Sequence, residues 1–302
     1  MSRVLVTGAG GFIGRRVLEP LQERGFEVHA VSRRRNTDSG DRAVTWHSAD
    51  LLDRPQREAV VEHAGASHLL HLAWYAEHGR FWTHPENVRW VGATGELLQE
   101  FAQAGGKRAV LAGSCAEYDW TGDGICVEGE TPLRPAKLYG TCKDATRRIC
   151  EALGRQLDVS VAWGRVFFIY GPEEDERRLV AAVARALVAG ERAATSEGTH
   201  IRDFLHVDDV AEAFAALVSA EVEGAVNIGA GRGVAIREVV EEIGRAAGRP
   251  DLLDIGALPA REGDPPVLVP DVGRLNATGW QPRLALRSGL SQTVDWWRSV
   301  SE

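Results

Sequence analysis

A glycine-rich turn directly after an apolar N-terminal segment constrains the fold more than any other feature of this chain. The segment RVLV (3–6) is typical of a buried strand, and TGAGGFIG (7–14) follows it and opens a helical pattern. Glycines at 8, 11 and 14 allow a sharp turn, close approach to a pyrophosphate and tight packing of the helix on the sheet. The free amides and the dipole of the helix N-terminus favour phosphates. We therefore expect a dinucleotide to contact Gly8, Gly11, Phe12, Ile13 and Gly14.

Short apolar segments alternate with amphipathic ones over the first 165 residues, which predicts repeated βα units. We expect strands at 3–7, 26–31, 43–47, 67–73, 107–113 and 159–166, with helices near 13–24, 54–63, 86–104 and 140–157. The near-continuous hydrophobicity of the strands fits a parallel sheet covered on both faces. The predicted fold class is therefore α/β, a Rossmann doubly wound parallel sheet with a small interleaved C-terminal substrate domain.

The later part of the chain gives the domain boundaries. Residues 171–202 carry one helical pattern, and 229–285 are rich in Gly, Pro and Arg, while a helix and a strand between them return to the sheet. We assign 1–170 and about 203–228 to the cofactor-binding domain, and about 171–202 and 229–302 to the smaller one. The charged run 173–178 is interpreted as a solvated loop.

Charge and cysteine content exclude some classes of function. A net charge of −8 over 302 residues argues against general binding to nucleic acid or to an anionic membrane. An anionic ligand must therefore be held by local arginines and backbone amides. The four cysteines lack C-x-x-C spacing, so we expect free thiols and no metal site. No apolar run is long enough to span a bilayer and no targeting segment precedes the first strand, so we expect a cytoplasmic protein.

The end of the second predicted strand bears on the choice of cofactor. NAD-binding chains place a carboxylate there for the ribose 2′-hydroxyl, but this strand ends Val31-Ser32-Arg33-Arg34-Arg35. An arginine fork suits a 2′-phosphate. We therefore predict NADP(H) rather than NAD(H), with Ser32 and Arg33 at the phosphate and Arg34 beside them. The alternative is that these arginines form only a solvated loop.

Three residues form a candidate catalytic set. Tyr139 and Lys143 are four residues apart, on one face of a predicted helix, and Ser114 ends the fifth strand, at the edge where open α/β sheets bind ligands. A lysine ammonium one turn away lowers the pKa of a tyrosine, which is otherwise about 10. A serine hydroxyl there can hydrogen-bond a carbonyl while the tyrosine transfers a proton. The set predicts hydride transfer to a ketone.

With these motifs in place, nearly the whole chain resembles the extended short-chain dehydrogenase/reductase superfamily, and specifically its nucleotide-sugar epimerases, dehydratases and reductases. The matching segments are TGAGGFIG (7–14), HSADLLD (47–53), HLA (71–73), ENV (86–88), RVFFIYGP (165–172), RDF (202–204), HVDDV (206–210) and REGDP (261–265), followed by Asp271 and Gly279-Trp280.

The resemblance implies further site residues. Asp50 and Leu51 match the pair that meets the adenine, and Leu72, Ala73 and Asn87 match positions beside the cofactor. The segment from Phe167 to Phe168 matches the path from the cofactor amide into the sugar site. The resemblance also implies that Arg202 and Arg261 bind a nucleotide diphosphate, although interdomain salt bridges are an alternative role for both.

Departures from the family pattern help to choose the reaction. Dehydratases carry Asp-Glu after the catalytic hydroxyl, where this chain has Cys115-Ala116, so dehydration is not expected. Epimerising reductases place a cysteine two residues before the following tyrosine, but that position, ahead of Tyr118, is Ala116. Many 4-epimerases direct an asparagine at the diphosphate from the position that Phe168 occupies here. This difference weakens the hypothesis that the chain is an epimerase.

These observations give one preferred function and two alternatives. We predict NADPH-dependent reduction of the C4 ketone of a nucleotide-linked 4-keto-6-deoxy sugar. The alternatives are an NAD-dependent nucleotide-sugar 4-epimerase and a non-catalytic NADP-binding scaffold protein. A nucleoside-diphosphate sugar is the expected partner. A homodimer through helices 86–104 and 140–157 is also expected, because Leu97, Leu98, Phe101 and Ile149 offer apolar surface, part of which must face the sheet.

Overall fold

The computed structural model describes residues 2–33, 43–121, 124–260 and 263–301, so the predicted site residues Arg34 and Arg261 lie outside the described residues. The strands are β1 (Arg3–Thr7), β2 (Glu27–Ser32), β3 (Val44–Ser48), β4 (His68–His71), β5 (Arg108–Ser114), β6 (Ile125–Cys126), β7 (Ser160–Val166), β8 (Phe168–Tyr170), β9 (Ala193–Thr195), β10 (Ile201–His206), β11 (Gly224–Ile228), β12 (Gly233–Ala235), β13 (Leu253–Ile255) and β14 (Val267–Pro270). The helices are α1 (Gly14–Glu23), α2 (Arg54–Ala64), α3 (Glu86–Gln103), α4 (Leu138–Leu157), α5 (Leu179–Val188), α6 (Val207–Ser219), α7 (Ile236–Ala247), α8 (Gly273–Asn276) and α9 (Leu286–Ser301), with single 3-10 turns at Cys115–Glu117 and Pro250–Leu252.

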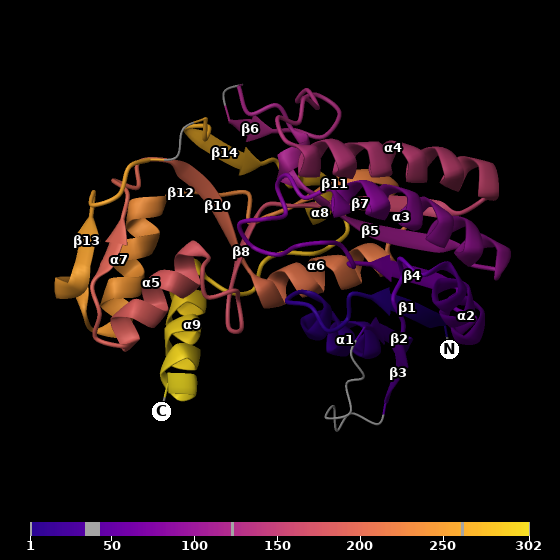
Figure 1. The fold of residues 1–302 in the computed structure, drawn as a ribbon, viewed down its shortest axis with the longest axis horizontal. Helices are drawn as coiled ribbons and strands as arrows, with labels where there is room; N and C mark the ends of the chain where they lie inside the picture. The colour runs from indigo at the N-terminus through magenta and orange to yellow at the C-terminus, as the bar shows by residue number, and fades with distance from the viewer. Residues whose placement is uncertain (1, 34–42, 122–123, 261–262, 302) are drawn as a thin grey trace.

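A seven-stranded parallel sheet in the order β11-β7-β5-β4-β1-β2-β3 forms the larger part of the molecule (Figure 1). The six predicted strands and four predicted helices are present, with ends that differ by one or two residues. The late segment 224–228 returns to the sheet as β11 at its edge. The predicted fold class, a Rossmann-type parallel sheet with flanking helices, is confirmed.

Alternate residues of each strand point to opposite faces of the sheet, so apolar side chains lie on both faces, and helices cover both. Val4 and Val6 join the cluster under α1 and α6, whereas Leu5 joins the cluster under α2 and α3. On α3, three of the residues proposed for a dimer surface face the sheet instead: Leu97, Leu98 and Phe101 are buried in that second cluster.

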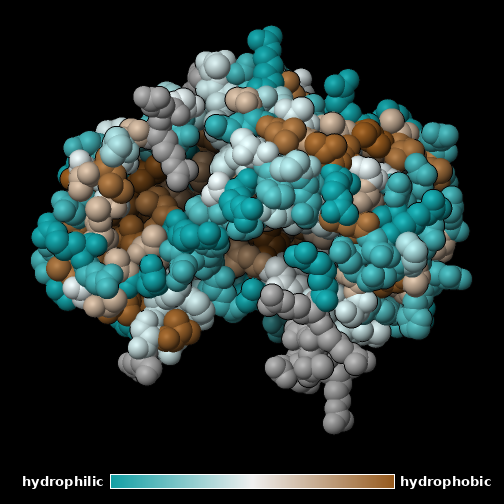
Figure 2. Space-filling view, viewed as in Figure 1, coloured by the Kyte–Doolittle hydropathy of each residue, from teal (hydrophilic) through white to brown (hydrophobic). Residues whose placement is uncertain are grey.

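Some apolar surface does remain on the outside of α3 and α4. Val88 is 58% exposed and Ile149 is 41% exposed. Figure 2 shows hydrophobic residues over α4, along the upper edge of the view. A homodimer through these two helices therefore stays a prediction, now centred on Val88 and Ile149 rather than on the buried residues of α3.

A second, smaller part is built on the strand order β12-β10-β14-β6, with β8 paired to β10, and on helices α5, α7 and α9, which share one hydrophobic cluster. Besides the short visit at β6, the chain enters this part when β7 continues through Phe167 into β8, leaves it when β10 runs directly into α6, and returns to it from β11 to β12. β8 and β10 lie between the two parts of the molecule (Figure 1). We propose the two-part division expected from the sequence, with β6 contributed to the smaller sheet from within the first 170 residues.

The charged run 173–178 is not simply a solvated loop, which corrects the sequence-based interpretation. Glu173 has a left-handed backbone with φ of 70°, and its carboxylate pairs with Arg15 and Arg16 of α1. Glu174 is only 5% exposed. The reason is tertiary: this segment is packed against the first turn of α1, which periodicity in the sequence does not reveal.

Candidate active site

The glycine-rich turn packs tightly against the chain that follows β4. Gly8 has φ of 67°, and a Cβ on it would lie 2.8 Å from the backbone nitrogen of Ala73, beside Leu72. A Cβ on Gly14 would collide with the carbonyl of Gly8. The turn therefore needs glycine at both positions, and its bare backbone is suited to a pyrophosphate. Within this frame, Gly11, Phe12 and Ile13 lie at the entry to α1, where they fit the dinucleotide expected from the sequence.

A buried hydrogen-bond chain fixes the bend at Leu72 and Ala73. The Thr7 hydroxyl accepts a hydrogen bond from the Ala73 backbone at 3.3 Å and lies 2.8 Å from Nδ1 of His71. The other ring nitrogen of His71 lies 3.1 Å from the Thr94 hydroxyl. Burial lowers the pKa of His71 to about 3, so its imidazole is neutral at neutral pH. His71 and Thr7 thus hold the wall of the cofactor site.

The residues expected at the adenosine end occupy different environments. Ser32 ends β2 and faces the turn, since a Cβ on Gly10 would lie 3.3 Å from its hydroxyl oxygen. Arg33 is exposed, and it makes no ion pair with any residue that the structure describes. Asp50 accepts a hydrogen bond from the Leu52 backbone at 3.0 Å, while Leu51 is buried in the core. The Asp50 side chain thus shapes the turn after β3.

Ser114 and Tyr139 meet at the carboxyl end of β5. The Ser114 hydroxyl accepts a hydrogen bond from the Ala116 backbone at 3.2 Å. Burial raises the pKa of Tyr139 above its ordinary value, and the neighbouring Ser114 side chain opposes that rise. The Tyr139 backbone donates to the Trp82 carbonyl at 3.1 Å, so the loop after β4 helps to hold this residue. The predicted serine–tyrosine pair is assembled.

Lys143 lies one helical turn beyond Tyr139, with its ammonium 5.9 Å from the centre of the Tyr139 ring. It is 4% exposed, donates to the Ala112 carbonyl at 2.9 Å, and lies 3.8 Å from the Trp74 ring centre. Burial lowers the pKa of Lys143 to about 7. A cation near the phenol favours the phenolate, so a charged Lys143 assists proton exchange by Tyr139.

Replacing Lys143 with methionine is expected to abolish activity yet raise the melting temperature of the protein, more at pH 6 than at pH 9. The lysine pKa is about 7 in the folded protein and 10.5 in an exposed chain. Below pH 7 the folded state carries the full cost of a buried charge, and between pH 7 and 10.5 wild-type stability recovers because the unfolded state binds more protons. Melting curves at both pH values test this, with exposed Lys107→Met as control; an equal gain at both pH values contradicts it.

Asn87, which is expected beside the cofactor, has its side-chain amide engaged by the protein. Its side chain is completely buried, its oxygen accepts from the Trp74 indole at 2.8 Å, and its nitrogen donates to the carbonyls of Phe81 and His84 at 2.7 and 2.8 Å. Both ends of the amide are thus engaged by the loop between β4 and α3. The structure indicates that Asn87 acts through Trp74, which it holds over Lys143.

The Glu117 carboxylate and the Cys115 thiol, both beside Ser114, are not available for acid–base chemistry. Glu117 is fully buried, and it accepts from the Ser114 backbone at 2.8 Å, the Trp163 indole at 2.9 Å and the Arg165 guanidinium at 2.7 Å. Burial raises the pKa of Cys115 to about 12, so its thiol stays protonated. Neither group fits the acid and base that a dehydration requires.

Arg202, which is expected on the substrate side, is buried, and its guanidinium makes one hydrogen bond to the residues that the structure describes. Its guanidinium donates to the Ile201 carbonyl at 2.8 Å and lies 3.8 Å from the Asp264 carboxylate. It also lies 5.5 Å from the centre of the Phe168 ring, so Phe168 supports this cation where many 4-epimerases have an amide. Phe167 is buried, with its backbone nitrogen bonded to the Ile228 carbonyl at 3.1 Å. An anion beside Arg202 would complete its pairing.

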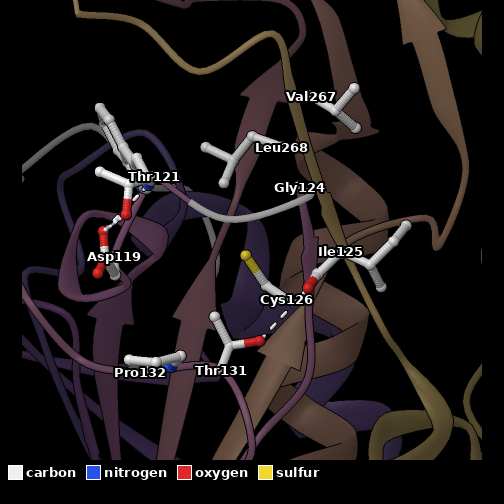
Figure 3. A pocket seen from close by; sticks show the side chains of 10 residues that line it. Asp119, Thr121, Gly124, Ile125, Cys126, Thr131, Pro132, Val267 and Leu268 are labelled. Atoms are coloured by element: carbon white, nitrogen blue, oxygen red, sulfur yellow. Dashed lines mark hydrogen bonds between the residues drawn. The ribbon is translucent and has the colours of Figure 1, made fainter.

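A small pocket of about 200 Å³ lies between β6, β14 and the loop after Ser114 (Figure 3). Leu268 and Cys126 project toward it from the two strands, and Thr131 closes one side. Trp120, which also lines it, donates its indole hydrogen to the Cys115 carbonyl at 3.0 Å. The pocket is therefore beside the Ser114–Tyr139 pair rather than around it.

Sequence reasoning missed the residues that cover Tyr139 and Lys143. Phe81 packs edge-on against Tyr139 with ring centres 4.8 Å apart, and Trp74 covers Lys143. The charge of Arg178, which is bonded to Glu174, lowers the pKa of Tyr139. The aromatic-rich stretch 74–82 directly after the HLA motif was a usable signal. The charged run 173–178 gave none.

Comparison with known proteins agrees with this geometry. The family model described as "NAD dependent epimerase/dehydratase family" matches residues 4–229. The UDP-glucose 4-epimerase of Streptomyces lividans is 31% identical, with 97% of this chain and 95% of that protein covered. The UDP-glucose 4-epimerase of Mycolicibacterium smegmatis is 30% identical, with 99% and 100% covered.

Solved structures give the same relationship. MoeE5 in complex with UDP-glucuronic acid and NAD has a TM-score of 0.86 and 33% identity, and 99% of this chain and 100% of that chain are covered. The Thermus thermophilus UDP-glucose 4-epimerase complex with NAD has a TM-score of 0.85 and 28% identity, with 98% and 99% covered. Among the described residues, none of the helices has the length and apolar character that crossing a membrane requires. The chain is thus an enzyme of the NAD-dependent epimerase/dehydratase family, within the extended short-chain dehydrogenases.

Proposed function

We propose that the protein is an NAD-dependent 4-epimerase of a nucleoside-diphosphate hexose, with UDP as the nucleotide. The observation that carries this proposal is the placement of the buried Lys143 beside the Tyr139 ring, near Ser114 at the end of β5, in a chain related along its whole length to UDP-glucose 4-epimerases. This reverses the order of the two catalytic hypotheses drawn from the sequence. The curated relatives are named as UDP-glucose 4-epimerases or as a UDP-glucuronic acid decarboxylase, and these names do not favour specific 4-keto reduction.

The cofactor, when bound, supplies a hydride acceptor that later returns the hydride. The chain supplies the proton chemistry. Ser114 hydrogen-bonds the sugar O4, and the Tyr139 phenol removes the proton from O4 as the alcohol becomes a ketone, then returns it. The Lys143 ammonium stabilises the phenolate in between. The glycine turn at 8–14, Ser32 and the Leu72–Ala73 bend would hold the dinucleotide.

Arg202 supports the assignment of a nucleoside diphosphate. A buried guanidinium with one backbone acceptor and a carboxylate at 3.8 Å retains donors for an anion. The protein is acidic overall, so specific contacts rather than long-range attraction must bind a diphosphate. Arg261, the second predicted contact, lies outside the described residues, and its role stays a prediction.

Arg202→Ala tests the nucleotide assignment. We expect the affinity for UDP to fall about 10- to 100-fold, as for loss of a charge-assisted contact of about 1.5–3 kcal/mol, and NAD affinity to stay nearly constant. Titration calorimetry with UDP and with NAD measures both, beside a melting curve. The matched control is Arg249→Ala, an exposed arginine 3.2 Å from Asp251. Unchanged UDP affinity in Arg202→Ala would reject the diphosphate site.

One observation favours the NADPH-dependent reductase as a second candidate. β2 ends without a carboxylate, and the exposed Arg33 beside Ser32 has no ion-pair partner among the described residues, as a 2′-phosphate contact requires. Fluorescence titration of the protein with NADPH and NADH separates the two candidates. Tighter binding of NADPH supports the reductase, whereas NAD that remains bound through purification supports the epimerase.

A further inference from the structure

Lys143 is a buried cation that forms no ion pair with any residue that the structure describes. It is 4% exposed, and its ammonium donates a hydrogen bond to the Ala112 carbonyl at 2.9 Å. Buried charges are ordinarily paired with an opposite charge, because their removal from water is costly. The Lys143 ammonium therefore requires another source of stabilisation.

The face of the Trp74 ring lies next to this ammonium. The Lys143 nitrogen is 3.8 Å from the centre of the Trp74 ring. The same nitrogen is 5.9 and 6.0 Å from the ring centres of Tyr139 and Trp163. The negative face of an indole attracts a cation within about 6 Å, and the attraction is strongest where water is excluded. Trp74 thus supplies a cation–π contact to Lys143 where an ion pair is missing among the described residues.

The position of the Trp74 ring is fixed by contacts with α3 and the loop before it. Its indole nitrogen donates to the Asn87 side-chain oxygen at 2.8 Å. Asn87 is fully buried, and its amide nitrogen donates in turn to the carbonyls of Phe81 and His84. The Trp90 ring stacks with Trp74, with ring centres 6.0 Å apart. The Trp74 ring therefore cannot turn away from the ammonium without breaking its hydrogen bond to Asn87.

We propose that Trp74 is a positioning residue for proton transfer: its ring holds the Lys143 ammonium in the charged form beside Tyr139 without cancelling that charge. This inference rests on the proposed function, in which the charge of Lys143 stabilises the Tyr139 phenolate. A carboxylate in place of the ring would neutralise the ammonium and repel the phenolate. An indole has no net charge, so it stabilises the cation without either effect.

The titratable groups that interact with Lys143, besides Tyr139, are Glu117, His71 and Cys150. Burial lowers the pKa of Lys143 to about 7, although the Glu117 carboxylate opposes this shift. Glu117 is already bonded to the Arg165 guanidinium at 2.7 Å. Burial lowers the pKa of His71 to about 3 and raises that of Cys150 to about 12, so both are neutral at neutral pH. None of these groups replaces the contact with Trp74.

The test is a direct titration of Lys143. The chain has three lysines, Lys107, Lys137 and Lys143, so isotope labelling of lysine gives three side-chain NMR signals to follow against pH. We expect Lys143 to titrate near pH 7 in the wild type. In Trp74→Leu it should titrate about one pH unit lower, a tenfold change in the protonation equilibrium, because leucine has no π face. Trp74→Phe keeps a π face and should stay within about half a unit of the wild type.

The pH profile of kcat/KM for UDP-glucose gives a second readout. Because the reaction requires the charged ammonium, its decline on the alkaline side should move to lower pH by about one unit in Trp74→Leu and be largely restored in Trp74→Phe. The matched control is Trp296→Leu, which removes another half-buried tryptophan. Trp296 packs edge-on against Trp297, with ring centres 4.7 Å apart, and both belong to α9. This variant should leave the Lys143 titration and the pH profile unchanged.

Melting curves identify the folded variants, and Trp74→Met, which also lacks a π face, replaces Trp74→Leu if the latter is unfolded. An unchanged Lys143 titration in the folded variant, or an equal downward shift in Trp74→Phe, overturns the role of Trp74 while the proposed function stands. If Lys143 titrates as expected but the wild type does not epimerise UDP-glucose, the cation–π contact is supported, whereas the proposed function and the role of Trp74 in proton transfer both fail.

Discussion

Replacing Tyr139 with phenylalanine is expected to lower kcat by about 10²- to 10⁴-fold, the range typical for loss of a positioned proton-transfer group. The ring keeps its edge-on contact with Phe81 and its backbone bond to Trp82, so the fold and the cofactor turn are untouched. Affinities for NAD and UDP should therefore stay near wild-type values. Steady-state kinetics with UDP-glucose, beside binding titrations, measures this separation of chemistry from binding.

The control is Tyr170→Phe, which also removes a buried phenolic hydroxyl. That hydroxyl donates to the Leu286 carbonyl at 3.3 Å, against α9, so its loss should alter stability slightly and leave kcat within a few-fold. Near wild-type turnover by Tyr139→Phe would show that another group moves the proton. In that case Ser114, whose side chain lowers the pKa of Tyr139, would be the next candidate.

The extent to which the sequence predicts this site depends on the kind of interaction that holds each residue. Gly8 and Gly14 could be assigned because a tight turn after a strand demands glycine, and the structure shows why a Cβ fails there. Tyr139 and Lys143 could be assigned because helical spacing alone puts them on one face. The ends of the parallel strands then bring Ser114 to them, as the fold class predicts.

Several contacts of these residues join distant segments, and the sequence does not show them. Asn87 is engaged by Trp74 and two loop carbonyls, and nothing in its local pattern shows those partners. Glu174 looks like one more charged loop residue until packing buries it against Arg178. Local sequence reports propensity and periodicity, whereas burial of a polar side chain in a loop is decided by tertiary structure.

Glu117 also illustrates this limit, because its position three residues after Ser114 suggests a catalytic role, while its contacts indicate a structural one. The carboxylate is fully buried and ion-paired with Arg165, whose guanidinium donates in turn to the Tyr118 hydroxyl at 3.1 Å. The Tyr118 hydroxyl donates to the Asn227 side chain at 2.8 Å, and Asn227 donates to the Cys126 carbonyl at 2.9 Å. A continuous polar network therefore joins β5 and β7 to β11 and to β6 of the smaller sheet.

Glu117→Ala is accordingly expected to lower the free energy of unfolding by about 3–5 kcal/mol, because it leaves the buried Arg165 charge without its partner. Urea denaturation measures the loss as a lower midpoint. Activity should fall as well, since the Ser114 backbone loses its acceptor, and Glu117→Gln should restore part of both because the amide oxygen can still accept. The control is Glu58→Ala, which breaks an exposed pair with Arg54 and should cost at most about 1 kcal/mol. If Glu117→Ala keeps wild-type stability but loses activity, the structural role of Glu117 is contradicted, and Glu117 acts instead as an acid–base group.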